Sequence, residues 1–183
     1  MDEISIIEKF YRKDSRALRV LLDHSKAVAE LAACISERLH LSQASRAFIG
    51  EAAMLHDIGI IATDSPGLGC EGLEPYIRHG IIGREMLEGV GLPLHALVCE
   101  RHVGVGITAA EIAARGLPLP ARDMVPLTIE EEIVCYADKF FSKNGKKGGL
   151  RKSPEEVERE LAGWGLARLP VFSEWRRRFG DPP

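Results

Sequence analysis

Long apolar runs are missing from this sequence of 183 residues. The longest nearly apolar stretch, residues 54–62, is interrupted by His56 and Asp57 and is far shorter than the roughly 20 residues that span a membrane. The first ten residues contain Asp2, Glu3 and Glu8 and lack the basic head and apolar core of a secretion signal. We therefore expect a cytoplasmic protein without a membrane partner.

Cysteine pairs are also missing, because none of the four cysteines forms a CxxC motif. A chain of this length that is not exported folds without disulfide bonds, so we expect reduced thiols. Cys34 and Cys135 lie in apolar helical patterns and are predicted to be core residues, whereas Cys70 lies in a Gly-rich loop and is predicted to be exposed.

Neither sign of charge dominates, since the sequence has 24 Lys and Arg and 27 Asp and Glu, a net charge of −3. This excludes a nucleic-acid binder with a basic surface throughout, so we expect no stable nucleic-acid binding. Residues 142–183 nevertheless carry +4 and residues 1–141 carry −7. Basic groups gather at 143–152 and 176–178, where they are either solvated or, beside a cleft, in contact with phosphate.

Alternation of apolar and polar residues, the pattern of a half-buried strand, is absent as well. Small and apolar residues instead recur at three- and four-residue steps from Leu18 to Ile35, which predicts a long helix ending near His40. The sequence therefore favours an all-α bundle.

N-cap residues predict where the other helices begin. Ser42 is expected to cap a second helix that runs up to residues 56–57. Capping boxes predict three later helix starts, at Thr108, Thr128 and Ser153. The simplest organisation is one domain over residues 1–142, followed by a basic loop and a C-terminal helical extension over residues 143–183 that packs on it.

One motif suggests chemistry: His56 precedes Asp57 inside the apolar phrase Leu55-His56-Asp57-Ile58-Gly59. An unpaired charge in such a setting would cost several kcal/mol, so a compensating partner is expected. A metal ion accepts both imidazole nitrogen and carboxylate oxygen. Further histidines and an aspartate share this apolar setting: His24, His79, His102 and Asp138. Near His79, Gly80 and Gly83 would allow another backbone to approach closely.

These residues resemble a known family. His24, His56-Asp57 and Asp138 resemble the H…HD…D signature of the HD superfamily of metal-dependent phosphohydrolases, and residues 56–59 are similar to its HDIG subgroup. His79 and His102 resemble the added ligands of the branch with two metals, which includes symmetrical dinucleoside tetraphosphatases and cyclic-dinucleotide phosphodiesterases. The resemblance covers residues 18–142, and in length the chain is similar to the small stand-alone HDIG proteins.

The resemblance implies a single HD-domain helical bundle that holds one or two divalent transition metal ions. Mixed His and Asp ligands fit Fe, Mn, Co, Ni or Zn. One implied ligand set is His24, His56, Asp57 and Asp138. The other is Asp57, His79 and His102.

The implied reaction is hydrolysis of a phosphomonoester or phosphoanhydride in a small, nucleotide-like substrate by a hydroxide that bridges the metals. His56 and Asp57 would then be catalytic, and Lys139 and Arg101 are the cations best placed in the sequence to contact the substrate. Arg84 is a weaker choice. The two remaining histidines match no position of the family: His40 and His95.

Other interpretations stay open at this point. Some HD-fold proteins use a similar ligand set as mixed-valence di-iron oxygenases, and an HD domain can also bind a ligand without turnover. The oligomeric state is open, with a homodimer among the states that the sequence allows. The basic loop from Lys143 to Lys152 follows the last ligand closely enough to lie over the cleft as a lid, and its Lys143, Lys146 and Lys147 would then contact an anionic substrate.

Overall fold

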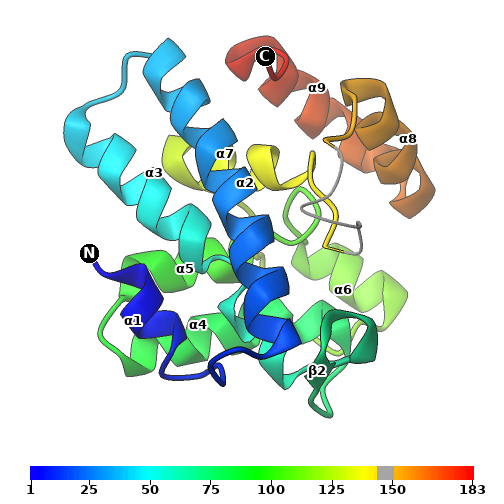
Figure 1. The fold of residues 1–183 in the computed structure, drawn as a ribbon. Helices are drawn as coiled ribbons and strands as arrows, with labels where there is room; N and C mark the ends of the chain where they lie inside the picture. The colour runs from blue at the N-terminus through cyan, green and yellow to red at the C-terminus, as the bar shows by residue number, and fades with distance from the viewer. Residues whose placement is uncertain (144–150) are drawn as a thin grey trace.

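Helices form most of the regular structure in this computed structural model, which describes residues 1–143 and 151–183. The helices α2 and α3 run side by side and pack against α7, while α4 and α5 lie at one end of this group (Figure 1). The helices of this main body are α1 (Glu3–Ile7), α2 (Arg16–Arg38), α3 (Gln43–Leu55), α4 (His79–Gly89), α5 (Pro93–Arg101), α6 (Ala109–Arg115) and α7 (Ile129–Asp138). The predicted all-α class is confirmed.

Short elements join α3 to α4. The strands β1 (Asp64–Ser65) and β2 (Cys70–Glu71) pair in antiparallel orientation. They are flanked by the 3₁₀ helices η1 (Ile58–Ala62), η2 (Pro66–Leu68) and η3 (Tyr76–Arg78). In the described part of the chain, no helix combines the length and apolarity needed to cross a membrane.

Side-chain caps define most of the helix starts, as the sequence predicts. The Ser42 hydroxyl accepts a hydrogen bond from the Ser45 backbone N–H at the start of α3. The same interaction caps α6 at Thr108 and α7 at Thr128, and Ser153 forms a complete capping box. Each cap satisfies a backbone donor that the first helical turn leaves free.

The C-terminal extension shares the core of the main body. It consists of α8 (Pro154–Trp164), η4 (Leu166–Arg168) and α9 (Leu169–Phe179). Tyr136 of α7 packs against Phe172 and Phe179 of α9, with ring centroids 5.3 and 5.6 Å apart. Because these rings are fully or almost fully buried, α9 is fixed to the helix that ends at Asp138.

Two cysteine predictions are wrong and one is right. Cys34 is exposed, because it lies on the solvent side of α2, beside the buried stripe that contains Ala32 and Ile35. Cys70 is fully buried, because β2 packs against Ile58 and its neighbours in the core rather than standing in an open loop. Cys135 is buried as predicted.

Candidate metal centre

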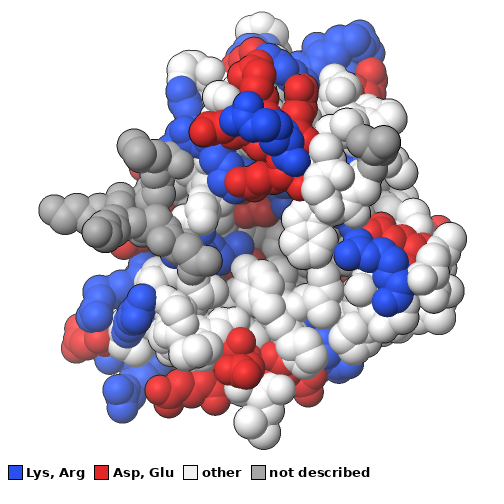
Figure 2. Space-filling model, turned by 90° about the vertical axis from the view of Figure 1, so that its right-hand side faces the viewer, with Lys and Arg blue, Asp and Glu red and all other residues white. Residues whose placement is uncertain are grey.

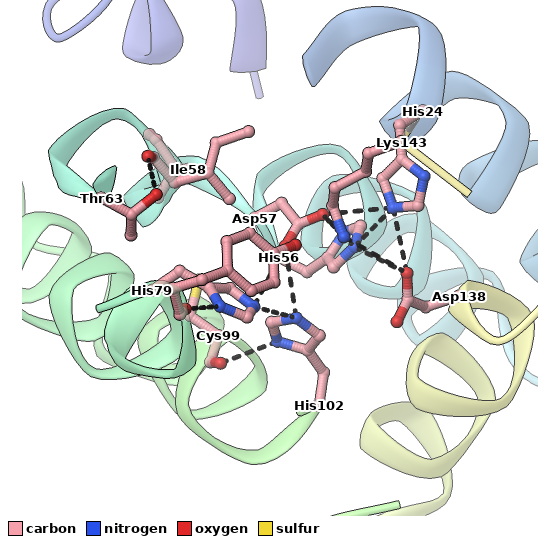
Figure 3. A network of polar contacts seen from close by, with 12 residues as sticks. His24, His56, Asp57, Ile58, Thr63, His79, Cys99, His102, Asp138 and Lys143 are labelled. Atoms are coloured by element: carbon pink, nitrogen blue, oxygen red, sulfur yellow. Dashed lines mark hydrogen bonds and ion pairs between the residues drawn. The ribbon is translucent and has the colours of Figure 1, made fainter. Parts of the chain in front are cut away.

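Six buried side chains from the ends and middle of five helices converge at one point (Figure 3). His24 comes from the middle of α2, whereas the others lie at or next to helix ends. His56 and His102 are the C-caps of α3 and α5, and Asp138 is the last residue of α7. The other two members are Asp57, which follows α3, and His79, which begins α4. Cations are favoured near helix C-termini, and three C-termini meet here.

The two carboxylate oxygens of Asp57 face two different pairs of imidazoles. Its Oδ2 lies 3.1 Å from Nε2 of both His24 and His56. Its Oδ1 lies 3.4 Å from Nε2 of His79 and 3.3 Å from Nε2 of His102. Asp57 therefore belongs to two groups of ligand atoms at once.

Asp138 completes the first of these groups. Its Oδ1 lies 3.0 Å from Nε2 of His24 and 3.5 Å from Nε2 of His56. In each group the ligand atoms lie within 4.8 Å of one another, so each group could hold a metal ion. The structure thus brings together all six residues that the sequence analysis selected as ligands.

Backbone carbonyls determine which nitrogen of three histidines carries the proton. Nδ1 of His56, His79 and His102 lies 2.7, 2.6 and 2.8 Å from a carbonyl oxygen three residues earlier in the chain. Because a carbonyl only accepts hydrogen bonds, Nδ1 is the N–H donor in each ring. In the neutral imidazole, Nε2 then presents its lone pair to the centre of the cluster.

Lone pairs facing one another require a cation between them. This is the arrangement of His79 and His102, whose Nε2 atoms are 3.2 Å apart. Nε2 of His56 lies 3.3 Å from Nε2 of His24, whose Nδ1 has no hydrogen-bond partner among the described residues. Among the described residues, buried Oδ1 of Asp57 also has no hydrogen-bond donor, and buried Oδ2 has one cation beside it, the ammonium of Lys143 at 2.7 Å. Buried acceptors without donors are costly, and divalent metal ions satisfy imidazole and carboxylate acceptors together. The residues therefore fit a metal.

Burial and neighbouring charges shift the pKa values in the cluster in opposite directions. Burial lowers the pKa of His79 to about 3 and also lowers the pKa of His102, so both are neutral at pH 7. Burial disfavours the charged form of His56 too, but the carboxylates of Asp57 and Asp138 raise its pKa to about 9. A metal ion that binds His56 must therefore displace a proton.

Lys143 supplies the cation that the acidic groups face. Its Nζ lies 2.7 Å from Oδ2 of Asp57 and 4.0 Å from Oδ1 of Asp138. Burial opposes ionisation of both aspartates, but the ammonium of Lys143 holds the pKa of Asp57 well below its usual range. The ammonium groups of Lys139 and Lys143 do the same for the pKa of Asp138. The sequence predicted Lys143 as a lysine of the lid that contacts substrate, but not its ion pair with Asp57. Two other lysines of the predicted lid, Lys146 and Lys147, lie outside the described residues.

The cations expected to contact substrate occupy different positions. Lys139 lies beside the cluster, with Nζ 2.8 Å from Oδ2 of Asp138. The guanidinium of Arg101 instead donates to both carboxylate oxygens of Glu131, at 2.8 and 3.0 Å. Arg84 forms ion pairs with two glutamates, Glu88 and Glu100. Of these three cations, only Lys139 lines the pocket described next.

A pocket of about 650 Å³ leads from the cluster to the surface. Its inner end is lined by His79, His102 and Asp138, with Tyr76 and Lys143 beside them. The space-filling view shows this hollow near the middle of one face, bordered by uncharged groups and by side chains of both charges (Figure 2). A volume of this size accommodates a small-molecule ligand.

The two other histidines lie outside the cluster, as the sequence analysis expects. His95 on α5 has its Nε2 3.2 Å from Oε2 of Glu51 on α3. His40 follows α2 with a φ of 53°.

Comparisons with known proteins match the stretch of chain that contains the ligand cluster. Residues 21–142 match the family model described as HD domain. A tRNA (cytidine(56)-2'-O)-methyltransferase of Thermoplasma volcanium is 30% identical over 168 residues, which cover 85% of this chain and 44% of that protein. The enzyme of the same name in Picrophilus torridus is 33% identical over 142 residues, 77% of this chain and 36% of that protein.

Two further comparisons extend this result. An uncharacterized protein of Methanocaldococcus jannaschii is 39% identical over 89 residues, 48% of this chain and 45% of that protein. The chain thus spans less than half the length of these curated relatives. The crystal structure of the HD domain of the L. monocytogenes phosphodiesterase PgpH covers 94% of both chains, with a TM-score of 0.54 and 14% identity, which shows a shared fold.

The family match includes the whole ligand cluster, from His24 to Asp138, and covers two thirds of the chain. The structural likeness independently supports the helical fold that brings these ligands together. The chain therefore belongs to the HD domain family.

Proposed function

We propose that this protein is a metal-dependent phosphohydrolase that cleaves a phosphomonoester or phosphoanhydride of a small, nucleotide-like substrate. The observation that carries the proposal is the position of Asp57, whose two oxygens face separate groups of imidazoles next to the pocket that His79, His102 and Asp138 line. A carboxylate shared in this way suits two neighbouring divalent ions. The HD family and the phosphodiesterase of similar fold support this class of reaction.

In this proposal the ligand groups described above hold two ions, with Fe, Mn, Co, Ni and Zn all suited to the donor set. Bound there, divalent ions would acidify water to give the nucleophile and would neutralise negative charge on the phosphate oxygens. The backbone carbonyls that accept from Nδ1 keep each Nε2 free for the metal. Lys139 and Lys143 supply positive charge where the phosphate would enter.

Metal removal tests the proposal directly. Metal-free protein is expected to release no phosphate from nucleotides, and Mn, Fe, Co, Ni or Zn added back without oxygen is expected to restore release. Metal at 100 times its Kd should also stabilise the fold by about 2.7 kcal/mol, which a thermal melt detects. Elemental analysis of the purified protein identifies the native metal. Phosphate release at the full rate from metal-free protein would contradict the proposal.

The same experiment separates the two alternative functions. A mixed-valence di-iron oxygenase would consume oxygen and would not release phosphate under anaerobic conditions with Mn or Ni. A binding domain without turnover would gain stability from metal but release phosphate with none of them. Phosphate release without oxygen therefore eliminates both alternatives.

The methyltransferase names describe longer proteins, of which this chain matches 44% and 36%. We propose that the segment shared with them is an HD unit joined to a separate transferase part. The mainly helical fold and the buried His and Asp cluster of the described residues support this division. Within the present chain, we propose that residues 1–142 form the HD domain and residues 143–183 its extension.

Replacing Lys143 by Met is expected to lower the stability of the metal-free protein but not that of the metal-loaded protein. Without metal, the variant leaves Asp57 buried and without its ammonium partner, which costs about 3 kcal/mol. With metal bound, the difference in Tm from the wild type should vanish. The KM for a phosphate substrate should rise about tenfold, as expected for loss of a charged hydrogen bond.

Lys13 offers the matched control, because it is an exposed lysine paired with Glu8 and lies outside the ligand groups and the pocket lining. Lys13→Met should leave both Tm values and the KM unchanged. A Lys143→Met variant that melts like the wild type without metal would show that the ammonium does not compensate Asp57.

A further inference from the structure

The C-terminal extension forms one wall of the pocket. Val157, Leu161 and Trp164 of α8 and Arg168 of η4 line it together with residues of the HD domain. Residues from two parts of the chain, before and after the segment that follows α7, therefore line the same pocket. Whatever binds at its outer end contacts residues that the family match, which ends at residue 142, does not include.

Trp164 is the unusual residue of this wall. It is the last residue of α8 and is 61% exposed although it lines the pocket. Large aromatic side chains gain most of their free energy from burial, so an open indole face in a pocket is a surface that a ligand can cover. Leu161, Leu117 and Ile107 add apolar surface to the same pocket.

A chain of contacts holds the indole in place. The guanidinium carbon of Arg115 lies 5.7 Å from the centroid of the Trp164 ring. Nη1 of Arg115 is 2.9 Å from Oε1 of Glu111, and the same Oε1 accepts from Arg168. Arg168 is buried and belongs to η4, so these contacts connect α6 to the C-terminal extension. Because both walls are joined at these points, the aromatic surface is preorganised rather than incidental.

We propose that Trp164 and Arg115 form a subsite for a planar aromatic ring carried by the phosphorylated substrate. A planar ring gains from stacking on an indole face and from the neighbouring guanidinium, as a flexible aliphatic group does not. The subsite rests on the proposed function, because it places the phosphate of the same molecule at the ligand cluster. The extension thereby recognises the leaving group while the HD domain acts on the phosphate.

The test compares nucleoside 5'-monophosphates carrying the four common bases with ribose 5-phosphate, which has the same phosphate and sugar without the aromatic base. In Trp164→Leu, kcat/KM for the nucleotides should fall about tenfold or more, mainly through KM, as expected for loss of one stacking contact. The value for ribose 5-phosphate should stay within about twofold of wild type by the same reasoning. Trp164→Phe should restore most of the loss.

Binding without turnover gives a second readout. Titration of the wild-type protein with each nucleotide should quench tryptophan emission saturably, and Trp164→Leu should lose that signal. Ribose 5-phosphate should quench neither protein. Leu94→Ala is the matched control, because Leu94 is 64% exposed but lies on α5, outside the pocket lining.

The outcomes distinguish the subsite from the reaction. If none of the four nucleotides quenches the wild-type emission, or if Trp164→Leu weakens hydrolysis of nucleotides and ribose 5-phosphate equally, the subsite is wrong. If quenching occurs but neither these monophosphates nor the corresponding nucleoside di- and triphosphates release phosphate with any metal, the subsite stands and the proposed function fails.

Discussion

Replacing Asp57 by Asn is expected to reduce phosphate release by more than about 10³-fold, beyond the effect of removing a single oxyanion donor. The reason is that Asp57 contributes one oxygen to each ligand group, so a single substitution weakens both sites. The amide is neutral and offers one poor acceptor where two anionic oxygens stood. Steady-state kinetics with saturating metal measures the loss.

The same variant should lose metal while keeping its fold. Elemental analysis is expected to show less than one ion per chain, and added metal should no longer raise Tm. Without metal, the substitution leaves the ammonium of Lys143 without its nearest carboxylate partner, so the Tm of the metal-free variant should lie below that of the metal-free wild type. Full metal content in Asp57→Asn would refute a shared carboxylate.

Glu51 provides a matched control for Asp57. It is also a carboxylate near a histidine, with Oε2 3.2 Å from Nε2 of His95, but it lies outside the ligand cluster. Glu51→Gln is expected to change neither the metal content nor the rate. A loss of rate in this variant comparable to that of Asp57→Asn would show that the assay responds to carboxylate removal in general.

Local sequence determined much of what could be predicted. Helix starts followed from single capping side chains, and these depend on contacts within four residues. Three of the ligands also form the same local hydrogen bond: each imidazole donates from Nδ1 to the carbonyl three residues earlier. Their orientation is thus set by their own helical turn, and only the packing of the turns against one another is tertiary.

Tertiary contacts explain what the sequence did not reveal. Lys143 reaches Asp57 because of the path the chain takes after α7, which no local pattern specifies. Arg101 neighbours a ligand in sequence, yet Glu131 in the first turn of α7 pairs with it. A residue adjacent to His102 points away from the centre that His102 faces, so adjacency in sequence was a poor guide to the cations.

Close backbone packing positions Asp57 against the second ligand group, and Gly59 makes it possible. A Cβ added to Gly59 would lie 2.1 Å from the carbonyl oxygen of His79 and 2.4 Å from the backbone nitrogen of Gly83. Both atoms belong to the backbone of α4, so no side chain can rotate away. Gly80 allows a similar approach toward α5, where a Cβ would lie 2.6 Å from the carbonyl oxygen of Cys99.

Gly59→Ala is therefore expected to destabilise the protein by about 3 kcal/mol or more, at the upper end of overpacking costs. For a domain of this size that corresponds to a fall in Tm of about 10 °C. Separation of η1 from α4 should also move Asp57 away from His79, so metal affinity in the surviving folded protein should fall. Thermal melts with and without metal measure both effects.

Gly50 is the matched control, because it lies within α3 and an added Cβ meets no atom within 4 Å. Gly50→Ala should stabilise the protein by about 0.5–1 kcal/mol, since alanine favours a helix interior over glycine. The same chemical change thus has opposite expected signs at two glycines that are close in the sequence. If both variants shifted Tm in the same direction, the prediction that Gly59 permits close packing of η1 against α4 would be wrong. The short distance between Asp57 and His79 would then need another explanation.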